Sequence, residues 1–126
     1  NLYGKENTEL KSLTENDTYF LRVDMLGLMA SLYDGIESKN PIAWPYHADS
    51  SMLEGLPPHA ITVNELDPLR DEGIAYSEKL KKAGISVSAK TIKGTVHAAE
   101  NIFPVEIPEI HNQAIEDIKS FSYSLK

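Results

Sequence analysis

The spacing of apolar residues predicts three helices. Apolar side chains three and four positions apart are typical of a helix with one buried face. The first such run begins at Asn16 or Asp17, either of which can cap a helix, and extends to about Tyr33. Its expected inward residues are Leu21, Met25, Leu28, Met29 and Leu32, with Phe20, Val23 and Leu26 broadening that face. The other two runs cover residues 71–83 and 108–125.

Two short apolar segments between these runs predict strands. Residues 60–66 alternate weakly, with Ile61, Val63 and Leu66 apolar, and residues 85–92 have a similar character. Each strand borders the helix at residues 71–83, and a strand–helix–strand unit of this length implies parallel pairing. The sequence therefore predicts an α/β fold, in which parallel strands are flanked by helices.

The remaining segments have no clear periodicity. Residues 1–13 are polar and mixed, and they are expected to form a loop. Residues 36–58 hold four of the seven prolines, and Trp44 and Tyr46 lie among them. Aromatic residues in such a segment more often anchor it to a core than line a pocket. We therefore expect an ordered connector rather than a flexible linker.

The length and composition of the chain limit its number of domains, its binding partners and its cellular location. A chain of 126 residues is long enough for one domain but not for two. Its formal net charge of −7 argues against nucleic acid and anionic membrane surfaces as partners. No apolar run approaches the roughly 20 residues that span a bilayer. Without a recognisable secretory signal we expect a cytoplasmic location, and a homo-oligomer remains open. The absence of cysteine excludes a disulfide and a thiol nucleophile.

Asp67 and His97 are the candidate chemical groups. Each follows a predicted strand, and the carboxyl ends of neighbouring parallel strands meet at one edge of a sheet. Pro68 keeps the residue before it extended until the chain turns. A carboxylate bonded to one nitrogen of an imidazole fixes the tautomer that acts as a general base. Acid before histidine is also the chain order of the α/β-hydrolase triad.

Simpler interpretations of these residues stay open. Asp67 would open a turn or cap the next helix, and His97 would be an ordinary loop histidine. Arg70, Asp71 and Glu72 are expected to form an exposed helix start. His97 and Glu100 are only a weak metal cue without a His-Glu-x-x-His pattern, so we expect no metal and no cofactor.

Four stretches resemble the C-terminal part of the hormone-sensitive-lipase-like branch of the α/β-hydrolases. They read ENDTYF, NPIAWPY, GLPPHAITVNELDPLRDEG and GTVHAAENIF. The resemblance implies a carboxylic ester hydrolase acting on a small-molecule ester, with Asp67 as triad acid and His97 as triad base. It also implies that residues 1–126 form the C-terminal segment of a single hydrolase domain. The His-Gly-Phe-like segment of that branch appears here as His97-Ala98-Ala99.

The nucleophile of that branch is absent from the sequence. Neither a Gly-x-Ser-x-Gly elbow nor a His-Gly-Gly-Gly-like oxyanion motif occurs in these 126 residues. The resemblance therefore implies a serine outside the chain, on an N-terminal hydrolase portion or a second polypeptide. A non-catalytic remnant, or an interaction module with a hydrolase skeleton, is the alternative. A standalone hydrolase with an unusual nucleophile is less favoured, because no Ser or Thr lies in a strand-to-helix elbow.

Overall fold

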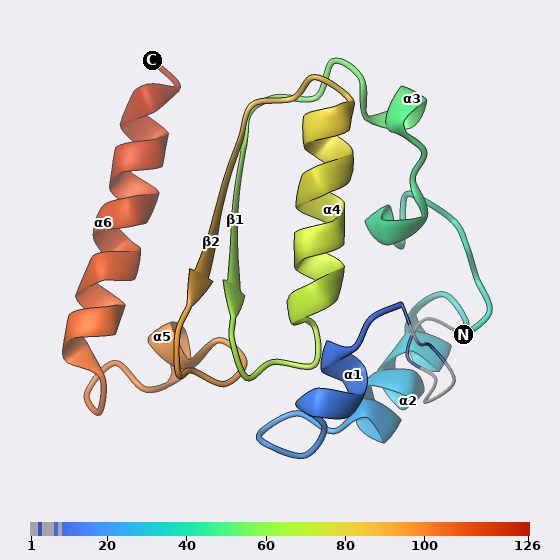
Figure 1. The fold of residues 1–126 in the computed structure, drawn as a ribbon, viewed down its shortest axis with the longest axis horizontal. Helices are drawn as coiled ribbons and strands as arrows, with labels where there is room; N and C mark the ends of the chain where they lie inside the picture. Colours follow the sequence, from blue (N-terminus) through green and yellow to red (C-terminus); the bar gives the residue numbers. More distant parts are fainter. Residues whose placement is uncertain (1–2, 4–6, 8) are drawn as a thin grey trace.

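The computed structural model describes residues 3, 7 and 9–126. Two paired parallel strands form its centre, and the long helix that connects them along the chain packs beside them (Figure 1). The elements, in chain order, are α1 (Ser12–Glu15), α2 (Val23–Tyr33), the 3-10 helix η1 (Pro45–His47), α3 (Ser50–Leu53), β1 (His59–Asn64), α4 (Arg70–Lys82), β2 (Val87–Ile92), α5 (Ala99–Ile102) and α6 (Pro108–Ser124).

The sheet confirms the predicted α/β class. β1 and β2 pair in parallel, from His59 opposite Val87 to Asn64 opposite Ile92. Helix α4 lies on one side of the two strands and α6 on the other, so that helices flank the sheet (Figure 1). The carboxyl ends of both strands point toward the end of the molecule where α1, α2 and α5 lie (Figure 1). Any group that follows either strand is therefore placed at this edge.

Two apolar clusters hold the elements together. Leu80 of α4 is fully buried against Ala48 and Leu53, and side chains from both strands pack around it. The second cluster joins the N-terminal helices to the connector. Its buried members are Leu10, Leu13 and Val23, with Tyr3, Trp44 and Tyr46 packed against them. The predicted role of Trp44 and Tyr46 as packing anchors is confirmed.

Several predicted boundaries were wrong. The first long helix begins at Val23 rather than near Asp17, because Thr18 has φ 72°, outside the helical region. Asp17 still accepts a hydrogen bond from the Val23 N–H at 2.9 Å, so it caps the helix from a distance. Strand β1 covers His59–Asn64 rather than residues 60–66, so it starts one residue earlier and ends two residues earlier than predicted. Strand β2 covers Val87–Ile92 rather than residues 85–92, so it starts two residues later.

The loop predicted for residues 1–13 falls partly outside the described residues. Where it is described, it ends in a helix: Ser12 and Leu13 open α1. The four-residue helices α1, α3 and α5 are all absent from the prediction. So short a helix spans little more than one turn, which leaves no apolar period to detect.

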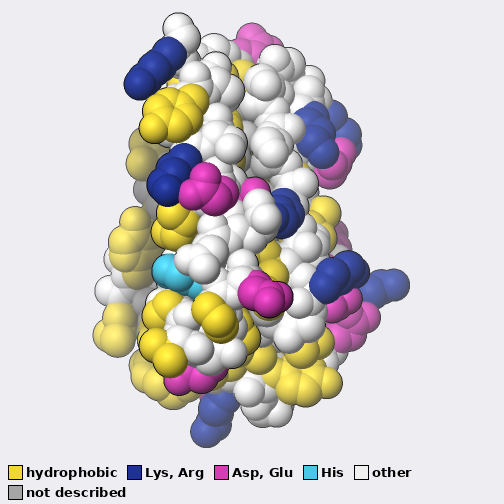
Figure 2. Space-filling model, turned by 90° about the vertical axis from the view of Figure 1, so that its left-hand side faces the viewer, with side chains coloured by type: hydrophobic (Ala, Val, Ile, Leu, Met, Phe, Trp, Pro, Cys, Tyr) yellow, Lys and Arg dark blue, Asp and Glu magenta, His cyan; other side chains and the backbone are white. Residues whose placement is uncertain are grey.

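The apolar face predicted for α2 is mostly exposed. Its buried residues are Val23, Leu26, Gly27 and Ala30, whereas Leu28 is 51% and Leu32 79% exposed. Helix α6 is also incompletely covered, because none of its residues is buried. A hollow of about 490 Å³ separates it from the strands. On the face in Figure 2, hydrophobic side chains gather mainly in the lower half.

Candidate active site

Asp67 occupies a tight turn between β1 and α4. Its Oδ1 accepts a hydrogen bond from the Leu69 N–H at 2.9 Å, and its carbonyl accepts one from the Arg70 N–H at 3.1 Å. Only 7% of the Asp67 side chain is exposed. The acid therefore does open a turn, as the simpler interpretation held, but this contact uses only one of its two carboxylate oxygens.

Helix α1 and Asn16, the residue that follows it, hold this turn in place. Asn16 Nδ2 donates to the carbonyls of Glu65 and Asp67, both at 3.1 Å. Ser12 Oγ donates to the Pro68 carbonyl at 2.7 Å and accepts from the Asp71 N–H at 3.1 Å. Ser12 and Asn16 are buried, so water does not compete for these bonds. Sequence reasoning missed both residues, since it assigned Ser12 to a loop and Asn16 to a helix cap.

His97 lies in the loop between β2 and α5. Near the start of this loop, Gly94 has φ 68°, and the Glu65 carboxylate accepts the Gly94 N–H at 2.8 Å. The Thr95 carbonyl accepts the Leu66 N–H at 2.9 Å, which extends the pairing of the two chains past the strands. The imidazole is 35% exposed, so a reactant can reach it, whereas the buried Asp67 is not accessible.

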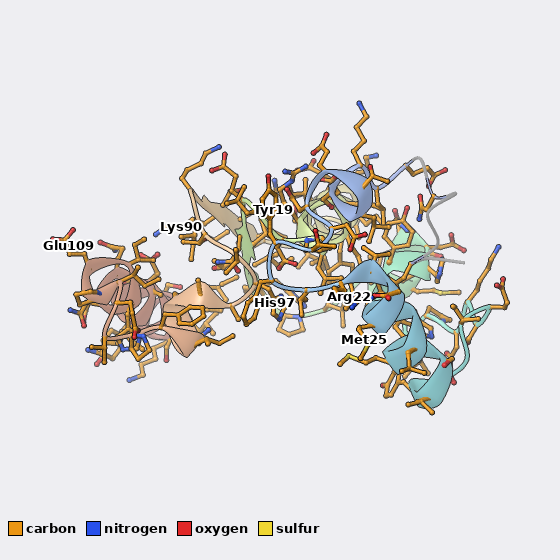
Figure 3. All side chains as sticks on the ribbon, turned by 90° about the horizontal axis from the view of Figure 1, so that it is seen from below. Tyr19, Arg22, Met25, Lys90, His97 and Glu109 are labelled. Atoms are coloured by element: carbon orange, nitrogen blue, oxygen red, sulfur yellow. The ribbon has the colours of Figure 1, made fainter. Side chains whose placement is uncertain are left out.

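The structure brings Asp67 and His97 into contact. His97 Nδ1 lies 2.8 Å from Asp67 Oδ2. Because this carboxylate oxygen accepts, the imidazole carries its Nδ1 proton toward the acid and leaves Nε2 for proton transfer. Figure 3 looks onto this edge of the sheet, where His97 lies between the α6 end marked by Glu109 and the α2 end marked by Met25. This arrangement can hold an imidazole as an oriented general base.

A second carboxyl group lies close to the pair. Glu72 lines a hollow of about 430 Å³ together with Asp67 and His97, and its Oε2 accepts the Tyr3 hydroxyl at 3.1 Å. Burial raises the pKa of Glu72, and the negative charge of Asp67 raises it further, against the lowering effect of the Tyr3 hydrogen bond. The site therefore disfavours a second negative charge beside Asp67.

The helix start at residues 70–72 is not exposed, contrary to expectation. Arg70 is half-buried and donates to Glu15 at 2.8 Å, to Asp71 at 2.9 Å and to the Glu65 carbonyl at 3.1 Å. These contacts tie α4 to α1 and to the end of β1. Arg70 thus supports the acid's turn.

Within the described part of the chain, no three His, Cys, Asp or Glu side chains gather in a way that could hold a metal ion. Glu100, the partner in the weak metal cue, instead accepts a hydrogen bond from Asn64 at 2.8 Å. Nor does any helix among the described residues have the length and apolar character needed to cross a membrane.

Comparison with known families agrees with this architecture. A family model described as the alpha/beta hydrolase fold matches residues 2–101. The chain belongs to the α/β-hydrolase family. In open α/β sheets, ligands bind beyond the carboxyl ends of the strands, and in this chain Asp67 and His97 meet at that edge.

Proteins similar to this chain include esterases and lipases. The solved structure of brefeldin A esterase, described as a bacterial homologue of human hormone-sensitive lipase, is 43% identical with a TM-score of 0.91. It matches over 95% of this chain and 35% of that one. Lipase 2 of Moraxella sp. (strain TA144) is 36% identical over 71% of this chain and 20% of its own length. Esterase LipI of Mycobacterium tuberculosis is 39% identical over 70% and 28%, respectively.

These relatives confirm the hormone-sensitive-lipase-like resemblance drawn from the sequence. The chain spans about a third or less of the length of each of these three proteins. Where the resemblance predicts glycine after the histidine, this α/β-hydrolase has Ala98, which adopts φ 51°. The departure noted in the sequence therefore keeps a backbone conformation that suits glycine.

Proposed function

We propose that this chain supplies the acid and the base of a serine carboxylesterase triad, Asp67 and His97. The nucleophilic serine would lie outside these 126 residues, and the chain would form the C-terminal segment of one hydrolase domain. The observation that carries the proposal is the 2.8 Å contact between Asp67 Oδ2 and His97 Nδ1, with the acid buried and the base accessible. The names of the relatives, esterase and lipase, favour a small carboxylic ester as substrate.

In the proposed reaction, His97 Nε2 takes the serine proton as the serine oxygen attacks the ester carbonyl. The imidazolium then gives this proton to the departing alkoxide, which leaves an acyl-enzyme. Nε2 next takes a proton from water as the hydroxide attacks the acyl group, and it returns that proton to serine. Throughout, Asp67 holds the tautomer and offsets the imidazolium charge.

Two features support a further hydrolase segment as partner. Within the described residues β1 pairs only with β2, so its other edge has no strand beside it. A parallel strand is normally buried between neighbours. The apolar side chains Met25, Leu28, Met29 and Leu32 of α2 are also exposed. A segment carrying the serine would cover such surfaces and reach the carboxyl edge where His97 lies.

The triad roles are tested by turnover of a p-nitrophenyl ester in the complete protein that carries this chain. Asp67→Asn is expected to lower kcat about 10⁴-fold, because His97 loses the acid that orients it. His97→Ala is expected to lower kcat by a comparable factor. The matched controls are Asp117→Asn, an exposed acid paired with Lys90, and His59→Gln, at the far end of β1. If Asp67→Asn stays within about tenfold of the parent, the triad assignment is wrong.

The position of the serine is tested separately. A serine-reactive phosphonate is added to the native protein, and the labelled peptide is located by mass spectrometry. The label is expected on a peptide outside residues 1–126, and label on any serine of this chain would contradict the proposal. If the complete protein takes no label and has no esterase activity, the non-catalytic alternative replaces it.

A further inference from the structure

The end of β1 carries a buried amide that bonds to the loop holding His97. Asn64 Nδ2 donates to Thr95 Oγ1 at 2.9 Å and to Glu100 Oε2 at 2.8 Å. Asn64 Oδ1 accepts from the Ala98 N–H at 3.0 Å. Asn64 and Thr95 are each 5% exposed, and Glu100 is 9% exposed. Three bonds from one side chain therefore reach residues on both sides of His97.

We propose that Asn64 is a positioning residue for the triad base. Its amide fixes the His97 loop relative to the strand that leads to Asp67, so that the acid and the base are held by one rigid element. The inference rests on the proposed function, because a positioning role requires that His97 be the base. With only 5% of its surface exposed, Asn64 would act through His97 rather than on the substrate directly.

The chemistry of the amide explains why asparagine suits this position. Both of its donor hydrogens face acceptors, and its oxygen faces a donor, so the group is fully matched to its surroundings. Aspartate has the same shape but no donor, and it would set a second carboxylate against Glu100. Asparagine is also disfavoured in strands, so strand formation alone does not select it.

The loop has reasons to need such support. Ala98 adopts φ 51°, a backbone conformation that residues other than glycine rarely take. The Asn64 Oδ1 atom accepts the Ala98 N–H. On the other side of His97, Thr95 Oγ1 also donates to the Ile92 carbonyl at 2.9 Å. Removing the amide would release both anchor points, and a displacement of about 1 Å at a catalytic group can cost about 100-fold in rate.

The test uses p-nitrophenyl ester turnover by the complete protein that carries this chain. Asn64→Asp is expected to lower kcat about 10- to 100-fold, with KM changed by less than about twofold. Adding Glu100→Gln should recover most of the loss, because the new amide can donate to the new carboxylate. Glu100→Gln alone should cost little, since its amide can present oxygen to Asn64.

A matched control separates positioning from general destabilisation. Leu80→Ala removes buried core contacts in α4 without touching the loop, and its kcat should stay at the parent value while its unfolding midpoint falls. If Asn64→Asp keeps its kcat within about twofold, the inference is overturned. It is also overturned if Leu80→Ala and Asn64→Asp lose the same fraction of kcat for the same fall in unfolding midpoint. An active His97→Ala would instead overturn the proposed function itself.

A second pair of variants covers the case in which Asn64→Asp does not fold. Thr95→Val removes the hydroxyl that Asn64 bonds and keeps the side-chain shape, whereas Thr95→Ser keeps the hydroxyl. The valine variant is expected to lose about tenfold in kcat and the serine variant to stay near the parent. Equal kcat values in the two variants would overturn the inference.

Discussion

Replacing Gly73 with alanine tests how closely α4 packs on β1. A Cβ atom at Gly73 would lie 2.6 Å from Val63 Cγ1. Carbon atoms in contact are normally about 3.5–4.0 Å apart, so the overlap is about 1 Å. Val63 is β-branched and stiff at χ1, and Leu80 anchors the same helix in the core. Either the valine leaves its rotamer or the helix moves.

The magnitude follows from two opposing terms. Overpacking of a core contact costs about 1–3 kcal/mol. Alanine in a helix interior is favoured over glycine by about 1 kcal/mol. We therefore expect Gly73→Ala to lower the free energy of unfolding by up to about 2 kcal/mol. Gly27 of α2 is the matched control, because a Cβ there would meet Ile36 Cδ1 at an ordinary 3.5 Å. Gly27→Ala should instead raise stability by about 1 kcal/mol.

Urea unfolding of the complete protein measures both variants, and Val63→Ala supplies the decisive background. It removes the atom that the new Cβ would strike, so Gly73→Ala should be stabilising there, as Gly27→Ala is in the parent. The expected coupling energy between the two positions is about 1–3 kcal/mol. If Gly73→Ala costs the same with and without the valine, steric overlap is not the cause and the reasoning is refuted.

Three further changes test contacts around the site. Ala98→Gly should raise the free energy of unfolding, measured in urea, by about 0.5–1 kcal/mol. A left-handed alanine costs about 1–2 kcal/mol, and the greater chain entropy of glycine in the unfolded state offsets part of the gain. A loss of stability would contradict this expectation. Asn16→Ala should lower the same quantity by about 1–3 kcal/mol, because two backbone carbonyls of the acid's turn lose their donor; an unchanged value would show that water replaces the amide. Burial raises the pKa of Glu72, so the folded state holds the proton more tightly than the unfolded chain, and stability falls as pH rises above the ordinary value of 4.5. Glu72→Gln should weaken that fall in a series of urea midpoints from pH 4.5 upward, and an identical slope would exclude Glu72 as its source.

The long elements were predictable because their signals are local. The helix that became α4 is marked by apolar residues on one side and ends before Gly84, which indeed has φ 79°. The same unit, with a strand at each end, is enough to predict parallel pairing. That pairing places Asp67 and His97 at one edge, and so their contact could be anticipated from sequence.

Burial was harder to predict than periodicity. The spacing of Met25, Leu28, Met29 and Leu32 correctly indicates one side of a helix, but it does not say whether a neighbour covers that side. In the described residues the covered side is the one with Val23 and its neighbours instead. A row of apolar side chains indicates which side of a helix can be buried, but its burial depends on which element packs against it.

The supporting polar contacts carry no local signal at all. Asn16 meets the Glu65 carbonyl across 49 residues of sequence, and Asn64 meets Thr95 across 31. A buried asparagine in a strand looks unfavourable when only its neighbours in sequence are considered. Its role emerges only when the fold brings a matched set of donors and acceptors around it.

The turn and triad interpretations of Asp67 do not exclude each other, and their combination makes Asp67→Asn informative. Oδ1 is held by the Leu69 N–H, which leaves Oδ2 directed at His97 Nδ1. Asparagine can keep its oxygen in the first contact, so the turn survives. Its NH₂ group then faces the imidazole and demands an acceptor, which places the ring proton on Nε2. The substitution should therefore preserve the fold while it reverses the tautomer, and a base with its proton on the wrong nitrogen cannot accept one from serine.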